Sequence, residues 1–103
     1  MLKINKENFN NILNDNRLSV IQFSAEWCGP CKMLSPIMEE VSNEYESINI
    51  GKIDVDNDGE IAINYGIKGI PAILFLKNGE VVDRLVGIQT KKLIEEKIDV
   101  FSV

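Results

Sequence analysis

The stretch Trp27-Cys28-Gly29-Pro30-Cys31 holds both cysteines of the chain, with two residues between them. This spacing suits reversible dithiol–disulfide chemistry, in which one thiolate attacks a disulfide and its neighbour resolves the mixed disulfide. Gly29 lets the backbone turn closely, and Pro30 is tolerated in the first turn of a helix, where its missing N–H costs little. The pentapeptide therefore predicts a redox-active turn that leads into a helix.

The flanking sequence places this turn between a strand and a helix. Residues 18–25 are rich in β-formers and apolar on both alternating faces, which predicts a buried central strand. Apolar residues then recur at helical spacing, which predicts a helix from about residue 28 to about residue 45, kinked at Pro36. A helix N-terminus favours negative charge, so we expect a thiolate at Cys28 and a more shielded Cys31 that acts second.

The remaining segments predict a single α/β domain, residues 1–103, with a mixed sheet. Asn5 and Thr90 are the expected helix caps, and Asn78-Gly79 predicts a two-residue type I′ hairpin turn. The further strands are expected at residues 2–4, 48–55, 72–77 and 80–86. Further helices are expected from the Asn5 cap to about residue 15, around residues 59–65, and after Thr90. The inner face of this last helix is expected to carry Leu93, Ile94, Ile98 and Phe101.

The composition excludes several classes of function. The 103 residues carry a net charge of −5, so the chain lacks the basic surface that nucleic acids and anionic membranes require. The longest apolar run, residues 70–76, is too short to span a bilayer. No secretory signal is visible at the N-terminus. We therefore expect a cytoplasmic monomer without nucleic-acid or membrane partners.

The chain also has no histidine, which removes Ser-His-Asp triads, Cys-His nucleophiles and HExxH zinc sites. Two cysteines fall short of the four ligands of a structural zinc site. Residues 54–59 match the opening of a calcium loop, but the glutamate that such a loop needs falls on Tyr65. We expect no metal and no cofactor other than the cysteine pair.

With these elements in place, the chain resembles the thioredoxin family. The pentapeptide is highly specific to that family, whereas a CxxC pair alone is not. The resemblance implies a thioredoxin fold, a five-stranded mixed sheet flanked by four helices. The matching residues follow the family's order: Phe23, residues 25–32, Pro36, Lys52, Asp56, residues 65–67, 69–71 and 77–79, and Gly87.

The resemblance also implies a function, that of a protein-disulfide reductase and electron carrier. Cys28 would be the nucleophile and Cys31 the resolving thiol, with Gly29 and Pro30 tuning the pair. The reaction would leave a Cys28–Cys31 disulfide. The implied partners are a thioredoxin reductase, which would reduce that disulfide again, and diverse target proteins that contain disulfides.

A substrate surface is implied as well. Ile70-Pro71 matches the family's cis-proline loop, in which the backbone of Ile70 would pair with an extended substrate. A trans proline that merely opens the next strand is the alternative. For Trp27, simple core packing is the alternative to a place on this surface. The flat apolar patch expected around the cysteines consists of Trp27, Gly69, Ile70, Val86, Gly87 and Ile88.

The chain departs from the family at Gln22, where typical members carry a buried aspartate beneath the cysteines. A glutamine cannot titrate, so Cys31 would lose its proton to water or by another route. The absence of a buried negative charge would also ease thiolate formation. The alternative is that Gln22 is only a hydrogen-bonded buried amide. Lys52 either pairs with Asp54 or favours the thiolate.

A smaller departure is Ser24, where some members of the family carry a second tryptophan. There we expect altered surface packing with little effect on chemistry.

Two other functions compete with a reductase. One is a non-catalytic subunit of a larger complex that uses the same patch, which the cysteine spacing disfavours. The other is an oxidant or isomerase of exported proteins. The absence of a visible signal sequence disfavours it, as does the Gly-Pro pair between the cysteines.

Overall fold

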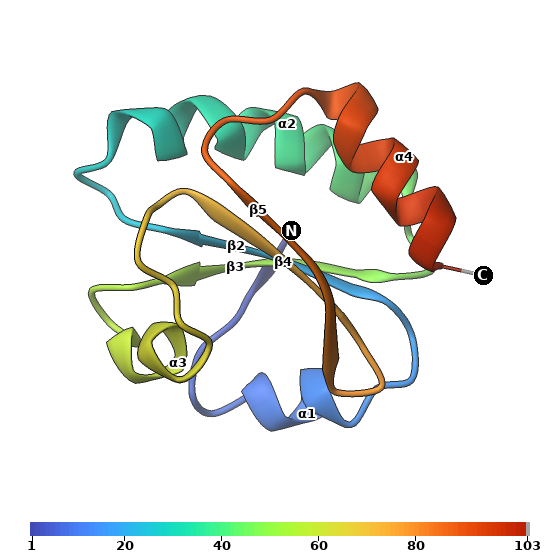
Figure 1. Ribbon diagram of the computed structural model, residues 1–103, viewed down its shortest axis with the longest axis horizontal. Helices are drawn as coiled ribbons and strands as arrows, with labels where there is room; N and C mark the ends of the chain where they lie inside the picture. The colour runs from blue at the N-terminus through green and yellow to red at the C-terminus, as the bar shows by residue number, and fades with distance from the viewer. Residues whose placement is uncertain (103) are drawn as a thin grey trace.

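A five-stranded mixed sheet forms the centre of the molecule, as the computed structural model shows for residues 1–102 (Figure 1). The strand order is β1-β3-β2-β4-β5. The first three strands in this order run parallel, β4 pairs antiparallel with β2, and β5 pairs antiparallel with β4. This arrangement confirms the predicted fold class. The strands are β1 (Leu2–Lys3), β2 (Ser19–Ser24), β3 (Asn49–Asp54), β4 (Ala72–Lys77) and β5 (Glu80–Val86).

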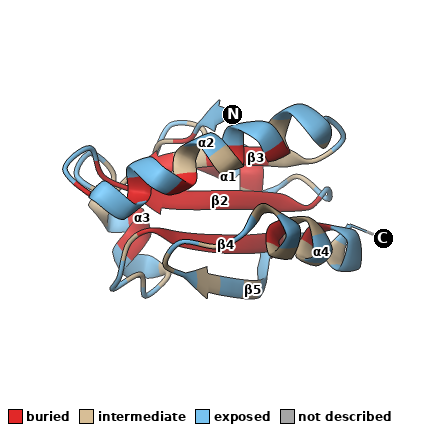
Figure 2. Ribbon diagram, turned by 90° about the horizontal axis from the view of Figure 1, so that it is seen from above, coloured by how far each residue is buried: buried red, intermediate tan, exposed pale blue. Residues whose placement is uncertain are grey.

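Strand β2 is the central strand that the sequence predicts, and all six of its residues are buried (Figure 2). Val20 contributes to one apolar core, while Ile21 and Phe23 contribute to the other. Burying a large aliphatic or aromatic side chain stabilises a fold by roughly 1.5–3 kcal/mol. Because the apolar side chains of this strand lie on both faces of the sheet, both faces require cover.

Four helices supply that cover: α1 (Phe9–Leu13), α2 (Gly29–Glu44), α3 (Gly59–Asn64) and α4 (Lys91–Phe101). Helices α2 and α4 lie on one face of the sheet, and α1 and α3 lie on the other (Figure 1). Pro36 lies inside α2, which continues past it. Within residues 1–102, no helix combines the length and the apolar character needed to cross a membrane.

Two local signals in the sequence are confirmed. Asn78 and Gly79 both have positive φ, at 54° and 77°, as a type I′ turn between β4 and β5 requires. Thr90 caps α4, because its Oγ1 accepts a hydrogen bond from the Leu93 N–H at 3.1 Å.

The predicted start of α1 is wrong. The helix begins at Phe9 rather than just after Asn5, and it ends at Leu13. The Asn5 side chain instead holds a turn before the helix, since its Oδ1 accepts hydrogen bonds from the N–H groups of Glu7 and Asn8. The Asn8 side chain in turn donates to the Lys3 carbonyl. These contacts fix residues 5–8 as a turn that joins β1 to a shorter helix.

The register of the strands gathers several chain segments at one edge of the sheet. Ser24 at the end of β2 pairs with Asp54 at the end of β3. Ala72 at the start of β4 pairs with Phe23 on one side and with Val86, the end of β5, on the other. The segments that follow β2, β3 and β5 therefore meet the segment that precedes β4.

Close packing between β1 and β3 gives a stability prediction for Gly51. A Cβ at this position would clash with the buried Ile4 side chain, whose Cγ1 would lie 2.8 Å away, and would approach the Leu2 carbonyl oxygen to 3.0 Å. We expect Gly51→Ala to lower the free energy of unfolding by about 1–3 kcal/mol in urea titrations. The control is Gly59→Ala, which has open space and should not lower it. Equal unfolding midpoints for the two variants would contradict the prediction.

Candidate active site

The cysteine pair forms the start of α2. Cys28 is the N-cap residue in an extended conformation, and Gly29 and Pro30 begin the helix. The Cys28 Sγ accepts a hydrogen bond from the Cys31 N–H at 3.3 Å, so a backbone donor of the first turn points at the sulfur. Gly29 and Pro30 are both exposed. Gly29 and Pro30 thus lie at the surface, while Cys28 itself is largely buried.

The two thiols are not equivalent. Both cysteines are free and buried, but Cys28 is 6% exposed and Cys31 only 1%. Burial raises the pKa of the Cys31 thiol to about 11, and the neighbouring Cys28 side chain adds to the rise. The Ala25 backbone and the positive charge of Lys52 lower the Cys31 pKa in part. Cys31 is therefore the shielded and protonated thiol of the pair at neutral pH.

The segment before β4 lies against Cys28. The Ile70-Pro71 peptide bond is cis, as the sequence comparison with the family implies. The Cys28 Sγ lies 3.9 Å from the Ile70 carbonyl oxygen. The Ile70 N–H donates no hydrogen bond within the described part of the chain. An extended peptide beside Cys28 thus meets a backbone donor that is not used internally.

An apolar surface surrounds this point. Trp27 is 70% exposed, which shows that simple core packing is the wrong interpretation for this residue. Its indole N–H donates a 2.8 Å hydrogen bond to Asp56, so the ring is held at the surface.

The segment after β5 completes this surface. Val86 and Ile88 are exposed apolar side chains, and the Gly87 N–H donates to the Pro71 carbonyl at 2.8 Å. A Cβ added at Gly69 would lie 3.5 Å from Val86. The structure thus brings Gly69 close to Val86, and Gly87 close to the Ile70-Pro71 bond beside Cys28.

Gln22 lies behind the cysteines, fully buried on β2. Its Nε2 donates to the Cys31 carbonyl at 3.4 Å and to Ser35 Oγ at 3.3 Å. Its Oε1 is buried and has no hydrogen-bond partner among the described residues. Leaving such an acceptor unpaired costs roughly 1–3 kcal/mol, so the amide is not simply a satisfied buried group.

Lys52 lies beside Gln22, because β3 and β2 pair these two positions. The proposed pairing of Lys52 with Asp54 is wrong: the described residues include no ion pair between them. The Asp54 carboxylate instead accepts hydrogen bonds from the Asp56 N–H and the Asn57 side chain, which follow it in the chain. Lys52 Nζ lies 3.5 Å from Ser35 Oγ. The Lys52 ammonium group therefore points toward α2.

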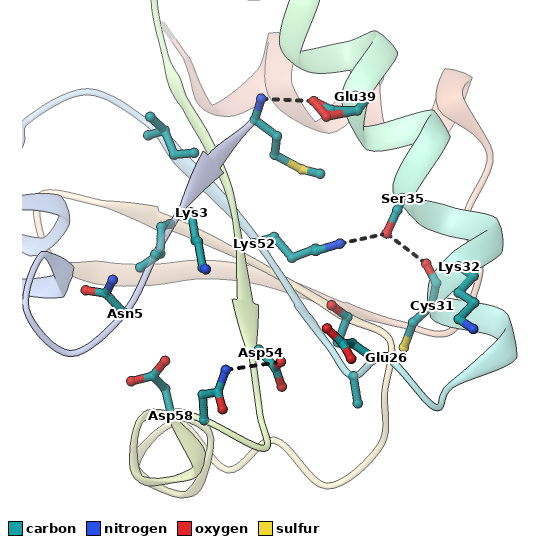
Figure 3. Close-up of a pocket in the computed structure, with 16 residues that line it drawn as sticks. Lys3, Asn5, Glu26, Cys31, Lys32, Ser35, Glu39, Lys52, Asp54 and Asp58 are labelled. Carbon is teal, nitrogen blue, oxygen red and sulfur yellow. Dashed lines mark hydrogen bonds and ion pairs between the residues drawn. The ribbon is translucent and has the colours of Figure 1, made fainter.

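A cleft of about 660 Å³ opens between α2, β1 and β3, and Cys31 is one of its lining residues (Figure 3). Lys52 and Ser35 point toward one another across it. Its lining carries both signs of charge, including Glu26, Lys32 and Asp54. Among residues 1–102, no three His, Cys, Asp or Glu side chains lie together as metal ligands.

Sequence reasoning missed Ser35 as a residue of the site. It lies four residues after Cys31 on α2, and its hydroxyl donates to the Cys31 carbonyl at 3.0 Å. The i to i+4 spacing places both residues on one face of the helix, and this is the signal that could have identified it.

The thioredoxin family model matches residues 1–100 of this chain. The chain belongs to the thioredoxin family. Members of this family are thiol–disulfide oxidoreductases, and they work without an external cofactor.

Individual relatives agree with this assignment. Thioredoxin 2 of Chlorobaculum tepidum is 44% identical over 89 residues, which cover 85% of this chain and 82% of that protein. Thioredoxin of Chlamydia caviae is 43% identical over 88 residues, covering 85% of each chain. Among solved structures, a mutant thioredoxin from Halobacterium salinarum NRC-1 superposes with a TM-score of 0.91 at 30% identity. That match covers 99% of this chain and 90% of the other.

The placement of Gln22 gives a prediction for thiol ionisation. In Gln22→Asp, a carboxylate replaces the neutral amide behind Cys31, and a negative charge there disfavours a second one on the sulfur. We expect the pKa of Cys31 to rise further, with about tenfold less Cys31 thiolate at a given pH. Thiolate absorbance, titrated in a Cys28→Ser background, measures this. Gln22→Asn is the uncharged control of matching size, and identical titration curves for the two variants would sink the prediction.

Proposed function

We propose that Cys28 is the attacking thiol and Cys31 the resolving thiol of a protein-disulfide reductase. One observation carries this assignment: Cys28 caps α2 beside the cis Ile70-Pro71 bond and the exposed apolar patch, while Cys31 lies behind it, more deeply buried and with its pKa raised.

The first step joins the target to Cys28. An extended target segment pairs with the Ile70 backbone, and its apolar side chains contact Trp27 and Val86. The Cys28 thiolate attacks one sulfur of the target disulfide. The Cys28–target bond forms as the target S–S bond breaks, and the second target sulfur leaves as a thiolate that takes a proton from solvent.

The second step releases the target. Cys31 gives up its proton to water, and its thiolate attacks Cys28 Sγ. The Cys28–Cys31 bond forms as the Cys28–target bond breaks, and the first target sulfur, which was bound to Cys28, leaves as a thiolate that takes a proton from solvent. The dithiol has lost two electrons and two protons, and the target disulfide has gained them.

A thioredoxin reductase then reduces the Cys28–Cys31 disulfide, so the protein acts as an electron carrier in the cytoplasm. The chain works as a single-domain monomer on diverse disulfide-containing proteins, because the patch offers apolar contact and backbone pairing rather than a shaped pocket. A purely binding subunit is not favoured, since the dithiol is intact at the centre of that patch.

Because the two cysteines have different roles, replacing each of them should stop the reaction at a different step. Cys28→Ser should abolish dithiothreitol-driven reduction of a protein disulfide, because no thiol remains beside the Ile70-Pro71 bond to attack the target. Cys31→Ser should also stop turnover but should accumulate a mixed disulfide with the target, visible on non-reducing gels. The double variant is the control and should form no adduct. Adduct formation by Cys28→Ser but not by Cys31→Ser would reverse the assignment.

A further inference from the structure

We propose that Ser35 is a positioning residue for the resolving step, because its hydroxyl holds the Lys52 ammonium and the Gln22 amide together beneath Cys31. The proposal rests on the roles assigned above to Cys28 and Cys31. It concerns how Cys31 ionises in a chain that has no carboxylate at position 22.

The Ser35 hydroxyl uses its full hydrogen-bonding capacity in this position. It donates to the Cys31 carbonyl at 3.0 Å, and it accepts from Gln22 Nε2 at 3.3 Å and from Lys52 Nζ at 3.5 Å. A hydroxyl has one proton to donate and two lone pairs with which to accept. Ser35 thus connects α2, β2 and β3 at this point. Figure 3 shows its contacts with Cys31 and Lys52.

Gln22 is held in a single orientation by the same contacts. The Cys31 carbonyl can only accept, so the amide must turn its N–H₂ group toward it, and its oxygen faces away without a partner among the described residues. The amide carries no charge and takes no proton. The role of the Gln22 amide is to connect the Ser35 hydroxyl and the first turn of α2 to the central strand β2.

Lys52 is therefore the charged group that this network directs toward Cys31, and its charge lowers the Cys31 pKa against the effect of burial. Other charged or titratable groups face the same region. Cys28, which acts on Cys31 directly, and Lys32 belong to the start of α2, and Glu39 lies further along this helix. The other charged side chains that line the cleft are Lys3, Glu26, Asp54 and Asp58. Among residues 1–102, none of them has a hydrogen bond to Ser35.

In this arrangement the Lys52 ammonium, rather than a carboxylate at position 22, supports the resolving step. In the mixed disulfide, the Cys31 proton passes to water in the cleft, which reaches Cys31, Ser35 and Lys52. The Cys31 thiolate is stabilised by the positive charge of Lys52 and then attacks Cys28 Sγ. The Cys28–Cys31 bond forms, and the target sulfur leaves with the electron pair of the broken bond. An uncharged amide and a cation replace a titrating carboxylate.

Ser35→Ala tests the proposal. The protein dithiol is mixed with a chromogenic aromatic disulfide in a single turnover. The first equivalent of coloured thiolate reports attack by Cys28, and the second reports resolution by Cys31. We expect Ser35→Ala to move the pH midpoint of the second phase upward and to slow that phase about three- to tenfold at neutral pH, as a pKa change of half to one unit requires. The first phase should keep its rate and pH dependence.

Matched variants separate positioning from a general structural effect. Ser42→Ala removes a half-buried serine from the same helix, away from the cysteines, and should leave both phases unchanged. Ser35→Thr keeps the hydroxyl and should restore the second phase. Lys52→Met should shift the second phase in the same direction, and adding Ser35→Ala to it should cause little further change, because both act through one contact.

The proposal is overturned if Ser35→Ala leaves the second-phase midpoint unchanged, if it slows both phases equally, or if Ser42→Ala has the same effect. Any of these results leaves the proposed function intact, provided that the unmodified protein releases both equivalents. Failure of the unmodified protein to release the second equivalent would overturn the cysteine roles instead. Urea titration of each variant shows whether it is folded.

Discussion

Strand β2 has all six of its residues buried. Its apolar side chains enter the core that α2 and α4 form on one face of the sheet and the core that α1 and α3 form on the other. A strand buried on both faces cannot slip by one residue without exchanging the two sets of side chains. Its end at Ser24 is therefore fixed, and with it the place where α2 begins. The redox pair takes its position from this constraint.

The first turn of α2 has two different surroundings. On one side, Cys28 meets the Ile70 carbonyl and the exposed Trp27, where a partner protein can bind. On the other side, Cys31 is closed off from the patch, and a cleft with charged walls reaches it. One helical turn thus separates the thiol that meets the substrate from the thiol whose ionisation depends on the protein interior.

The sequence predicted the elements well where the signals are local. The Asn78-Gly79 turn, the Thr90 cap and the buried run of β2 each depend on neighbouring residues, and each is confirmed. The start of α1 was wrong, because the Asn5 side chain accepts from nearby backbone N–H groups in a turn before the helix begins. The pairing of Lys52 with Asp54 was also wrong, since the loop after β3 takes up that carboxylate.

By itself, the sequence determined the family through the resemblance that the cysteine pentapeptide and the other matching residues carry. It also determined the succession of strands and helices along the chain and the position of the cysteine pair at a helix start, because these follow from residue spacing and local backbone preference. Only the tertiary structure decided that Trp27 lies at the surface, that Gln22 keeps an unpaired oxygen, and that Ser35 joins Gln22 to Lys52. These are contacts between segments far apart in the chain. Their geometry depends on how α2 packs on the sheet, which no local pattern records.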